Sequence, residues 1–96
     1  MRATRLLAVA AMLLVPGAPG QAEAPPGAAS CSGCHAASAR VDTAVPRLTG
    51  RSAAELASGM QAFKSGQKPG TVMGRIAKGF SDAEIQAIAD WYAAQK

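Results

Sequence analysis

The sequence predicts an all-α fold of about four short helices. Two Ser-x-x-Glu capping boxes stand directly ahead of stretches in which apolar residues recur at helical spacing, and no segment alternates apolar and polar residues as a strand would. A chain of 96 residues holds at most one domain. We therefore expect one small helical unit.

The first 22 residues have the layout of a secretory signal peptide. Arg2 and Arg5 make the start basic, an apolar run follows over residues 6–15, and small residues and prolines lead to Ala22. An uncleaved anchor is the weaker alternative, because a membrane-spanning helix needs roughly 20 apolar residues. We expect cleavage after Ala22, or after Ala24, and a periplasmic domain over residues 23–96 that keeps no stable membrane anchor.

The first half of this domain carries few helix signals. Residues 23–27 contain two prolines and predict a stiff, non-helical leader. Residues 28–39 are rich in small side chains and could form one short helix. Residues 41–50 contain Pro46 and Gly50, which predict a loop.

A longer helix is expected from Ser52 to about Gly66. Ser52 can cap the first turn while Glu55 reaches back to it. The apolar residues at helical spacing are Leu56, Met60 and Phe63. Residues 67–70 contain a proline and a glycine and predict a turn.

Two further helical stretches follow. Residues 71–78 can form one or two turns closed by Gly79, and a second capping box, made by Ser81 and Glu84, opens the clearest helix of the chain. The apolar stripe of that helix consists of Ile85, Ile88, Ala89 and Tyr92, with Trp91 beside it.

The expected domain has a thin core. Residues 23–96 contain 17 alanines and only 14 larger apolar side chains, and eight basic against six acidic residues leave a net charge of +2. A domain this short rarely folds on such a core without a disulfide, a metal or another staple. The composition therefore excludes a large enzyme with its own substrate pocket and predicts that another group fills the interior.

Cys31, Cys34 and His35 form the motif C-x-x-C-H. On a helix these positions share one face, so the two thiols can bond to the vinyl groups of one haem while the imidazole offers a nitrogen to the iron. The motif therefore predicts one covalently attached haem c. Three alternatives are weaker: a disulfide would close too short a loop to stabilise the chain much, a thioredoxin-like pair needs a βαβ setting, and zinc needs four ligands.

The second axial ligand must differ from the first, because His35 is the only histidine. Met73 is favoured, since it follows the Pro69 turn, where a loop can bring its sulfur to the far side of the ring. Met60 is the alternative, although its place on an apolar stripe is typical of core packing. Thioether ligation raises the potential and fills the iron's coordination sphere, which predicts outer-sphere electron transfer. A sensor with an open iron site would need Met73 not to ligate.

Other residues could surround the haem. The carbonyl of Pro46 could accept the remaining ring N–H of His35 and fix its tautomer, or the proline could simply stiffen its loop. Five basic residues could steer an acidic partner to an exposed haem edge, or be ordinary solvated residues. They are Arg47, Lys64, Lys68, Arg75 and Lys78. The candidates to pack on the ring or behind it are Leu48, Leu56, Met60, Phe63, Val72, Ile76 and Ile88.

With these residues, the chain resembles a class I cytochrome c over nearly all of residues 23–96. Residues 70–85 and 88–92 are similar to the cytochrome subunit of flavocytochrome c sulfide dehydrogenase and its small periplasmic relatives. The resemblance implies a covalent haem on Cys31 and Cys34, His35 and Met73 as axial ligands, and the Pro46 carbonyl behind His35. The stretch before Cys31 is short for the family, which puts the usual crossing of N- and C-terminal helices in question.

These observations predict a single-haem electron carrier without a catalytic site of its own. Its expected partners are redox proteins, and no nucleic-acid partner is expected. The alternative is the haem subunit of a sulfide-oxidising flavocytochrome c complex, in which the resemblance implies electrons arriving from a flavoprotein subunit. Nothing in the chain itself predicts flavin binding.

Overall fold

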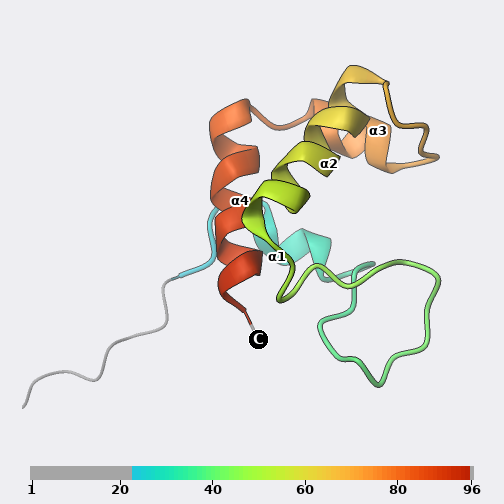
Figure 1. Cartoon of the computed structure of the whole chain (residues 1–96), viewed down its shortest axis with the longest axis vertical. Helices are drawn as coiled ribbons and strands as arrows, with labels where there is room; N and C mark the ends of the chain where they lie inside the picture. The colour runs from blue at the N-terminus through green and yellow to red at the C-terminus, as the bar shows by residue number, and fades with distance from the viewer. Residues whose placement is uncertain (1–22, 96) are drawn as a thin grey trace, which may run out of the picture.

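A computed structural model describes residues 23–95, so the predicted signal peptide over residues 1–22 lies outside the described part of the chain. The described residues form four helices: α1 (Ala28–Cys31), α2 (Ala53–Ser65), α3 (Met73–Lys78) and α4 (Asp82–Ala94) (Figure 1). They contain no strand. The predicted all-α fold of four short helices is confirmed.

Helix α1 is shorter than the stretch of residues 28–39 from which it was predicted. It ends at Cys31, but the backbone turn continues, because the N–H groups of Cys34 and His35 both donate to the carbonyl of Cys31, at 3.2 and 2.8 Å. Beyond this turn the chain is irregular to residue 52. The small side chains of residues 36–39 bury too little surface to offset the ordering of further helical turns.

The two long helices begin at their predicted caps. In α4 the capping box is complete: Ser81 Oγ accepts from the N–H of Glu84 at 3.2 Å, and the Glu84 carboxylate accepts from the N–H of Ser81 at 2.9 Å. In α2 only half of the box forms. Ser52 Oγ accepts from the N–H of Glu55, but the Glu55 carboxylate pairs with the Arg51 guanidinium instead.

The core lies where α1 meets α4. Ala28, Ile88 and Tyr92 form a buried cluster there, and the Tyr92 hydroxyl donates to the carbonyl of Ala28. Gly27, just before α1, also packs closely on Phe80, just before α4: its φ is +87°, and a Cβ atom there would lie 2.5 Å from Cε1 of Phe80. The crossing of the first and last helices is therefore present, reduced to a single turn of α1.

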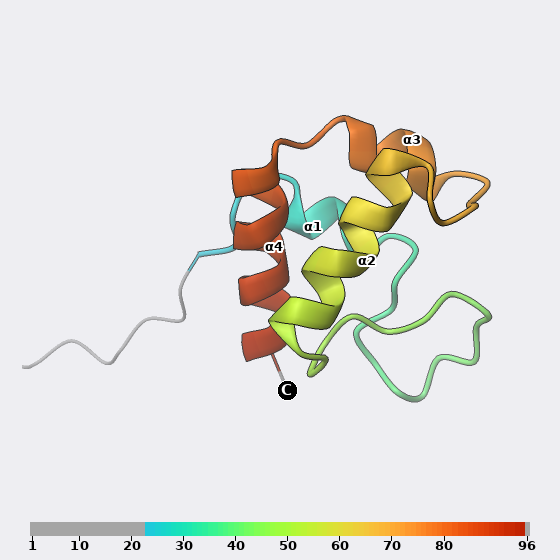
Figure 2. The same ribbon diagram turned by 45° about the horizontal axis from the view of Figure 1, so that its top comes forward.

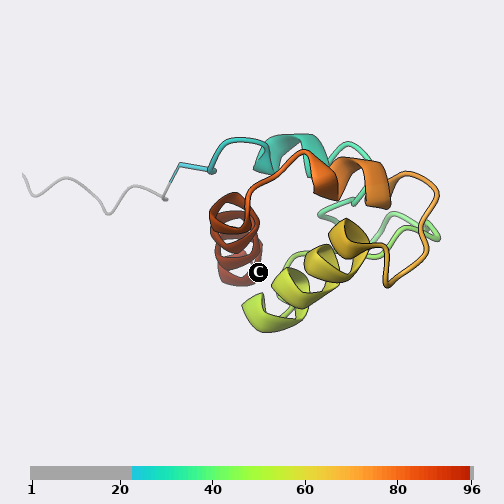
Figure 3. The same cartoon turned by 90° about the horizontal axis from the view of Figure 1, so that it is seen from above.

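The four helices are arranged in a ring when the molecule is viewed from above (Figure 3). Helix α2 packs against α3 and α4, and α3 crosses near the C-terminal end of α2 (Figure 2). No residue of α2 is buried, and its predicted apolar stripe of Leu56, Met60 and Phe63 is only half-buried. The inner face of α2 therefore still has apolar surface to cover. Within residues 23–95 no helix has the length and apolar character needed to cross a membrane.

Candidate functional site

A cavity of about 1020 Å³ occupies the space between the helices. Its wall combines the turn after α1, the loop around Pro46, the inner faces of α2 and α4, and the loop that leads into α3. The cavity is lined by Cys31, Cys34, His35, Pro46, Met60 and Met73. It is also lined by all seven apolar residues expected to pack on the ring, namely Leu48, Leu56, Met60, Phe63, Val72, Ile76 and Ile88. The fold thus brings the sequence-predicted site residues together in one space.

The two thiols lie close together at the end of α1: Cys31 is its last residue, and Cys34 lies in the turn that follows. Cys31 is half-buried, Cys34 is exposed, and both are free. Burial raises the pKa of the Cys31 thiol, although hydrogen bonding opposes this effect. Within residues 23–95 no group of three or more His, Cys, Asp or Glu side chains converges on a common metal position.

Tyr92 fixes the thiol-bearing turn to α4. Its hydroxyl proton goes to the carbonyl of Ala28, so the hydroxyl of Ser32, 2.9 Å away, donates to the tyrosine oxygen. Burial raises the pKa of Tyr92 and keeps the phenol protonated. The sequence placed Tyr92 on an apolar stripe and missed this role. The signal was available, because a buried tyrosine hydroxyl usually finds a hydrogen-bond partner.

The His35 ring is held by the loop that carries Pro46. Its Nδ1 atom lies 2.6 Å from the carbonyl oxygen of Pro46. A carbonyl can only accept, so this contact requires the proton to be on Nδ1. The other ring nitrogen, Nε2, then keeps its lone pair for a metal. The residue pair singled out in the sequence therefore has the geometry of an oriented metal ligand.

Both candidate methionines lie on the cavity wall. Met60 comes from the middle of α2, and Met73 is the first residue of α3. Both side chains are half-buried. Each thioether therefore remains a candidate for the side of the cavity away from His35.

The five predicted docking cations have different surroundings. Lys68 lines the cavity, and its Nζ lies 4.9 Å from the centre of the Phe63 ring. Lys64 is half-buried and donates to the carbonyl of Phe80 at 2.8 Å and to Asp82 at 3.1 Å, so it joins α2 to the start of α4. The exposed cations that do not line the cavity are Arg47, Arg75 and Lys78.

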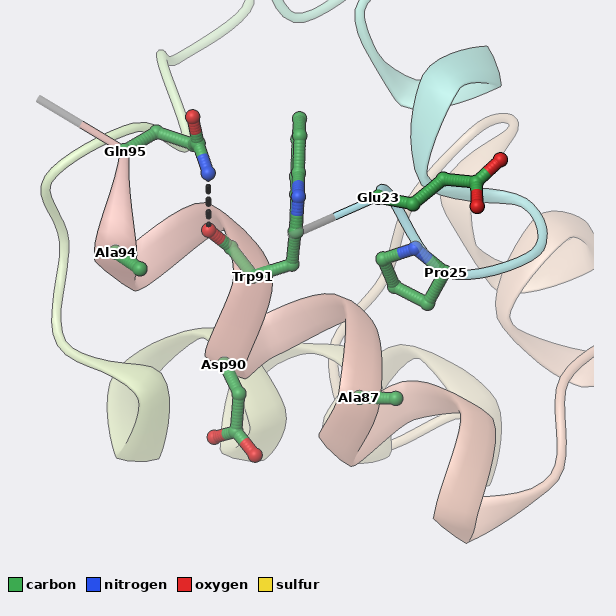
Figure 4. Close-up of a pocket in the computed structure, with 7 residues that line it drawn as sticks. All are labelled: Glu23, Pro25, Ala87, Asp90, Trp91, Ala94 and Gln95. Carbon is green, nitrogen blue, oxygen red and sulfur yellow. Dashed lines mark hydrogen bonds between the residues drawn. The ribbon is translucent and has the colours of Figure 1, made fainter. Parts of the chain in front are cut away.

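A second pocket, of about 530 Å³, lies on the outer side of α4 (Figure 4). The indole of Trp91 stands opposite Glu23 and Pro25 there, with Asp90 along the helix (Figure 4). Its lining contains no thiol, imidazole or thioether. Of these two pockets, the larger cavity is therefore the one lined by the residues of the predicted haem site.

The larger cavity fits a haem c. Ligand sites commonly measure about 300–1,000 Å³, and a cavity at the upper end of this range suits a large planar group. Two free thiols, an imidazole with a free nitrogen and two thioethers are the donors that a c-type haem uses. The remaining wall is largely apolar, so a large apolar group in the cavity would complete the thin core.

No protein-family model matches the chain. The chain is, however, similar in sequence to several individual proteins. Over 63 residues the chain is 36% identical to the cytochrome subunit of sulfide dehydrogenase from Chlorobaculum tepidum, covering 66% of this chain and 57% of that protein. Over 96 residues it is 40% identical to the thiosulfate dehydrogenase electron acceptor from Thiomonas intermedia, covering 96% of this chain and 44% of that protein.

A third relative is closer in length. Over 71 residues the chain is 35% identical to cytochrome c-554(548) from Halomonas halodenitrificans, covering 70% of this chain and 86% of that protein. The chain thus spans about half the length of the first two relatives and most of the third. Two of the three relatives are named as cytochromes, and the other is named as an electron acceptor.

Proposed function

The chain belongs to the class I c-type cytochromes, which carry haem c and transfer electrons, and on this premise we propose a periplasmic single-haem carrier whose iron would be held by His35 and Met73. One observation carries the proposal. His35 Nδ1 lies 2.6 Å from the Pro46 carbonyl, at the wall of a cavity that also exposes two thiols and the Met73 side chain. These residues supply a complete set of attachments and ligands for one haem.

Each residue has a distinct task in this proposal. Cys31 and Cys34 would hold the haem through thioether bonds, and His35 and Met73 would offer Nε2 and sulfur to the iron. When bound, the haem supplies an iron that gains and loses one electron. The Pro46 carbonyl keeps the proton on Nδ1 of His35 and prevents the ring from turning. Tyr92 and Ser32 keep the thiol-bearing turn against α4, and the apolar wall excludes water.

Replacing each of the two methionines in turn by alanine tests the ligand assignment. Met73→Ala should lower the reduction potential and allow carbon monoxide to bind the reduced protein, because it removes a thioether that would fill the coordination sphere. Met60→Ala, the matched control, should leave both properties unchanged and reduce the free energy of unfolding by about 2 kcal/mol, the low end for such truncations, since Met60 is only half-buried. A redox effect at Met60 and none at Met73 would overturn the assignment.

The similarity to the sulfide dehydrogenase subunit supports a second candidate function. In that case the chain is the haem subunit of a sulfide-oxidising complex and receives electrons from a flavoprotein. Purification at low ionic strength from the native host distinguishes the two functions. A stable complex that contains flavin supports the subunit, and a monomer with haem alone supports the free carrier.

We also propose that residues 1–22 are an export signal and that residues 23–96 form the mature domain. The basic, apolar and small-residue layout of this segment supports the proposal. Intact-mass measurement of the haem protein from a periplasmic extract tests it. A mass that begins at Glu23 is expected, and haem protein that retains Met1 would contradict export by cleavage.

A further inference from the structure

The loop that leads into Met73 lies directly against the ring of Phe63. A Cβ atom placed on Gly70 would lie 2.8 Å from Cε1 and 3.1 Å from Cδ1 of that ring, and 3.6 Å from Cβ of Met73. The first distance is shorter than carbon atoms tolerate without a shift of one partner. The backbone at Gly70 therefore rests on the ring with no room for a side chain.

Lys68 contacts the same ring from the beginning of the loop. Its N–H donates to the carbonyl of Ala62 at 3.0 Å, which ties the loop to the last turns of α2. Its ammonium group lies 4.9 Å from the ring centre of Phe63, within range of a cation–π contact. The loop thus contacts the ring at both Lys68 and Gly70.

The remaining part of the loop has few other fixed points. Within the described part of the chain, residues 69–71 make no hydrogen bond to α2, and the bonds to the carbonyl of Val72 come from α3 itself. Past the hydrogen bond at Lys68, packing on the ring rather than hydrogen bonding therefore sets the separation between residues 69–71 and α2. Met73 is the first helical residue after this loop, so this separation, together with the packing of α3 on α2, sets where its side chain enters the cavity.

We propose that Phe63 is a positioning residue for Met73: its ring is a spacer of fixed thickness on which Gly70 and Lys68 rest. The proposal rests on the proposed ligation of the iron by Met73. A side chain added at Gly70 moves the loop away from α2, and a smaller side chain in place of Phe63 lets the loop move closer to α2. In both cases the Met73 sulfur would move away from the place at which it could bind the iron, and external ligands would compete more easily for the iron.

The test uses the haem-loaded protein and two variants that alter the contact in opposite directions. Gly70→Ala adds a methyl group where the ring leaves no room, and Phe63→Leu thins the spacer without adding a clash. Each should raise the affinity of the oxidised protein for imidazole roughly tenfold, which corresponds to about 1.4 kcal/mol. Each should also weaken the charge-transfer absorption of a sulfur–iron bond.

The double variant separates positioning from a general loss of stability. In Gly70→Ala combined with Phe63→Leu, the added methyl occupies the space that the smaller side chain vacates, so imidazole affinity should return toward the original value. If the two substitutions only destabilised the protein, their effects on imidazole affinity would add in the double variant. Additive effects, or a double variant no better than Gly70→Ala, would overturn the proposal, and so would a Gly70→Ala protein with unchanged imidazole affinity.

Two controls keep this proposal distinct from the one on which it rests. Gly74→Ala adds the same methyl group to α3 outside the cavity wall, where the nearest atom is the carbonyl oxygen of Phe63 at 3.7 Å, an ordinary contact, and should leave imidazole affinity unchanged. Met73→Ala defines the fully open site. If Met73→Ala changes neither imidazole affinity nor absorption, the ligand assignment itself fails; if Met73→Ala changes both and Gly70→Ala changes neither, only the spacer fails.

Discussion

The histidine side and the methionine side of the cavity are held by different forces. On the histidine side, hydrogen bonds join residues far apart in the sequence: Tyr92 to Ala28 and Ser32, and His35 to Pro46. On the methionine side, one backbone hydrogen bond from Lys68 to Ala62 ties the start of the loop to α2, and the stretch that leads into Met73 rests on Phe63 by packing. Hydrogen bonds fix direction as well as distance, whereas packing mainly fixes distance. The side that bears the proposed covalent attachments is therefore the more strongly oriented one.

This difference predicts how each side should fail. Damage to the histidine side should cost attachment and stability, because it loosens the turn on which both thiols lie. Damage to the methionine side should open the iron to outside ligands while the haem remains attached. The following variants test this division, beginning with the one that should have the largest effect.

Replacement of both thiols tests how far the fold depends on what fills the cavity. The variant Cys31→Ser with Cys34→Ser should lose covalent haem and most of its helical circular dichroism. The reason is that, within residues 23–95, the buried hydrophobic core consists of only six residues beside a cavity of about 1020 Å³. They are Ala28, Ala77, Ile85, Ile88, Ala89 and Tyr92. A well-folded protein without haem would contradict this expectation. The control is Met73→Ala on the methionine side, which should keep both its haem and its helices.

Removal of the Tyr92 hydroxyl tests the hydrogen bonds of the histidine side alone. Tyr92→Phe leaves the buried carbonyl of Ala28 without its partner and should lower the free energy of unfolding by about 1–3 kcal/mol. Urea unfolding of the haem-loaded protein measures the change. Ser32→Ala is the matched control, because it removes the exposed partner of the same hydroxyl and should cost about 1 kcal/mol or less. Equal losses in the free energy of unfolding for the two variants would mean that the hydrogen bond to Ala28 stabilises the protein no more than the one to Ser32.

The two sides also differ in how much of them the sequence predicts. C-x-x-C-H fixes the thiols and His35 by local spacing, and the helix starts at Ser52 and Ser81 follow from local capping. The contact between Gly70 and Phe63 cannot be predicted this way, because it depends on the path of a loop whose residues carry no periodic pattern. The extent of α1 was overestimated for a related reason: small residues allow a helix but do not require one.

The smallest effect is expected at the polar tie behind the methionine side. Hydrogen bonds from Gln61 and Lys64, together with the charge of Lys64, hold the pKa of Asp82 below its ordinary value of 3.8. The stabilisation is therefore complete above pH 3.8 and is lost as the pH falls through the lower folded-state pKa. Asp82 is exposed, so Asp82→Asn should remove only a small part of the acid dependence in urea unfolding between pH 2 and 7. Asp42→Asn controls for the loss of one negative charge, and a larger loss at Asp82 than in Tyr92→Phe would reverse the proposed ranking of the two sides.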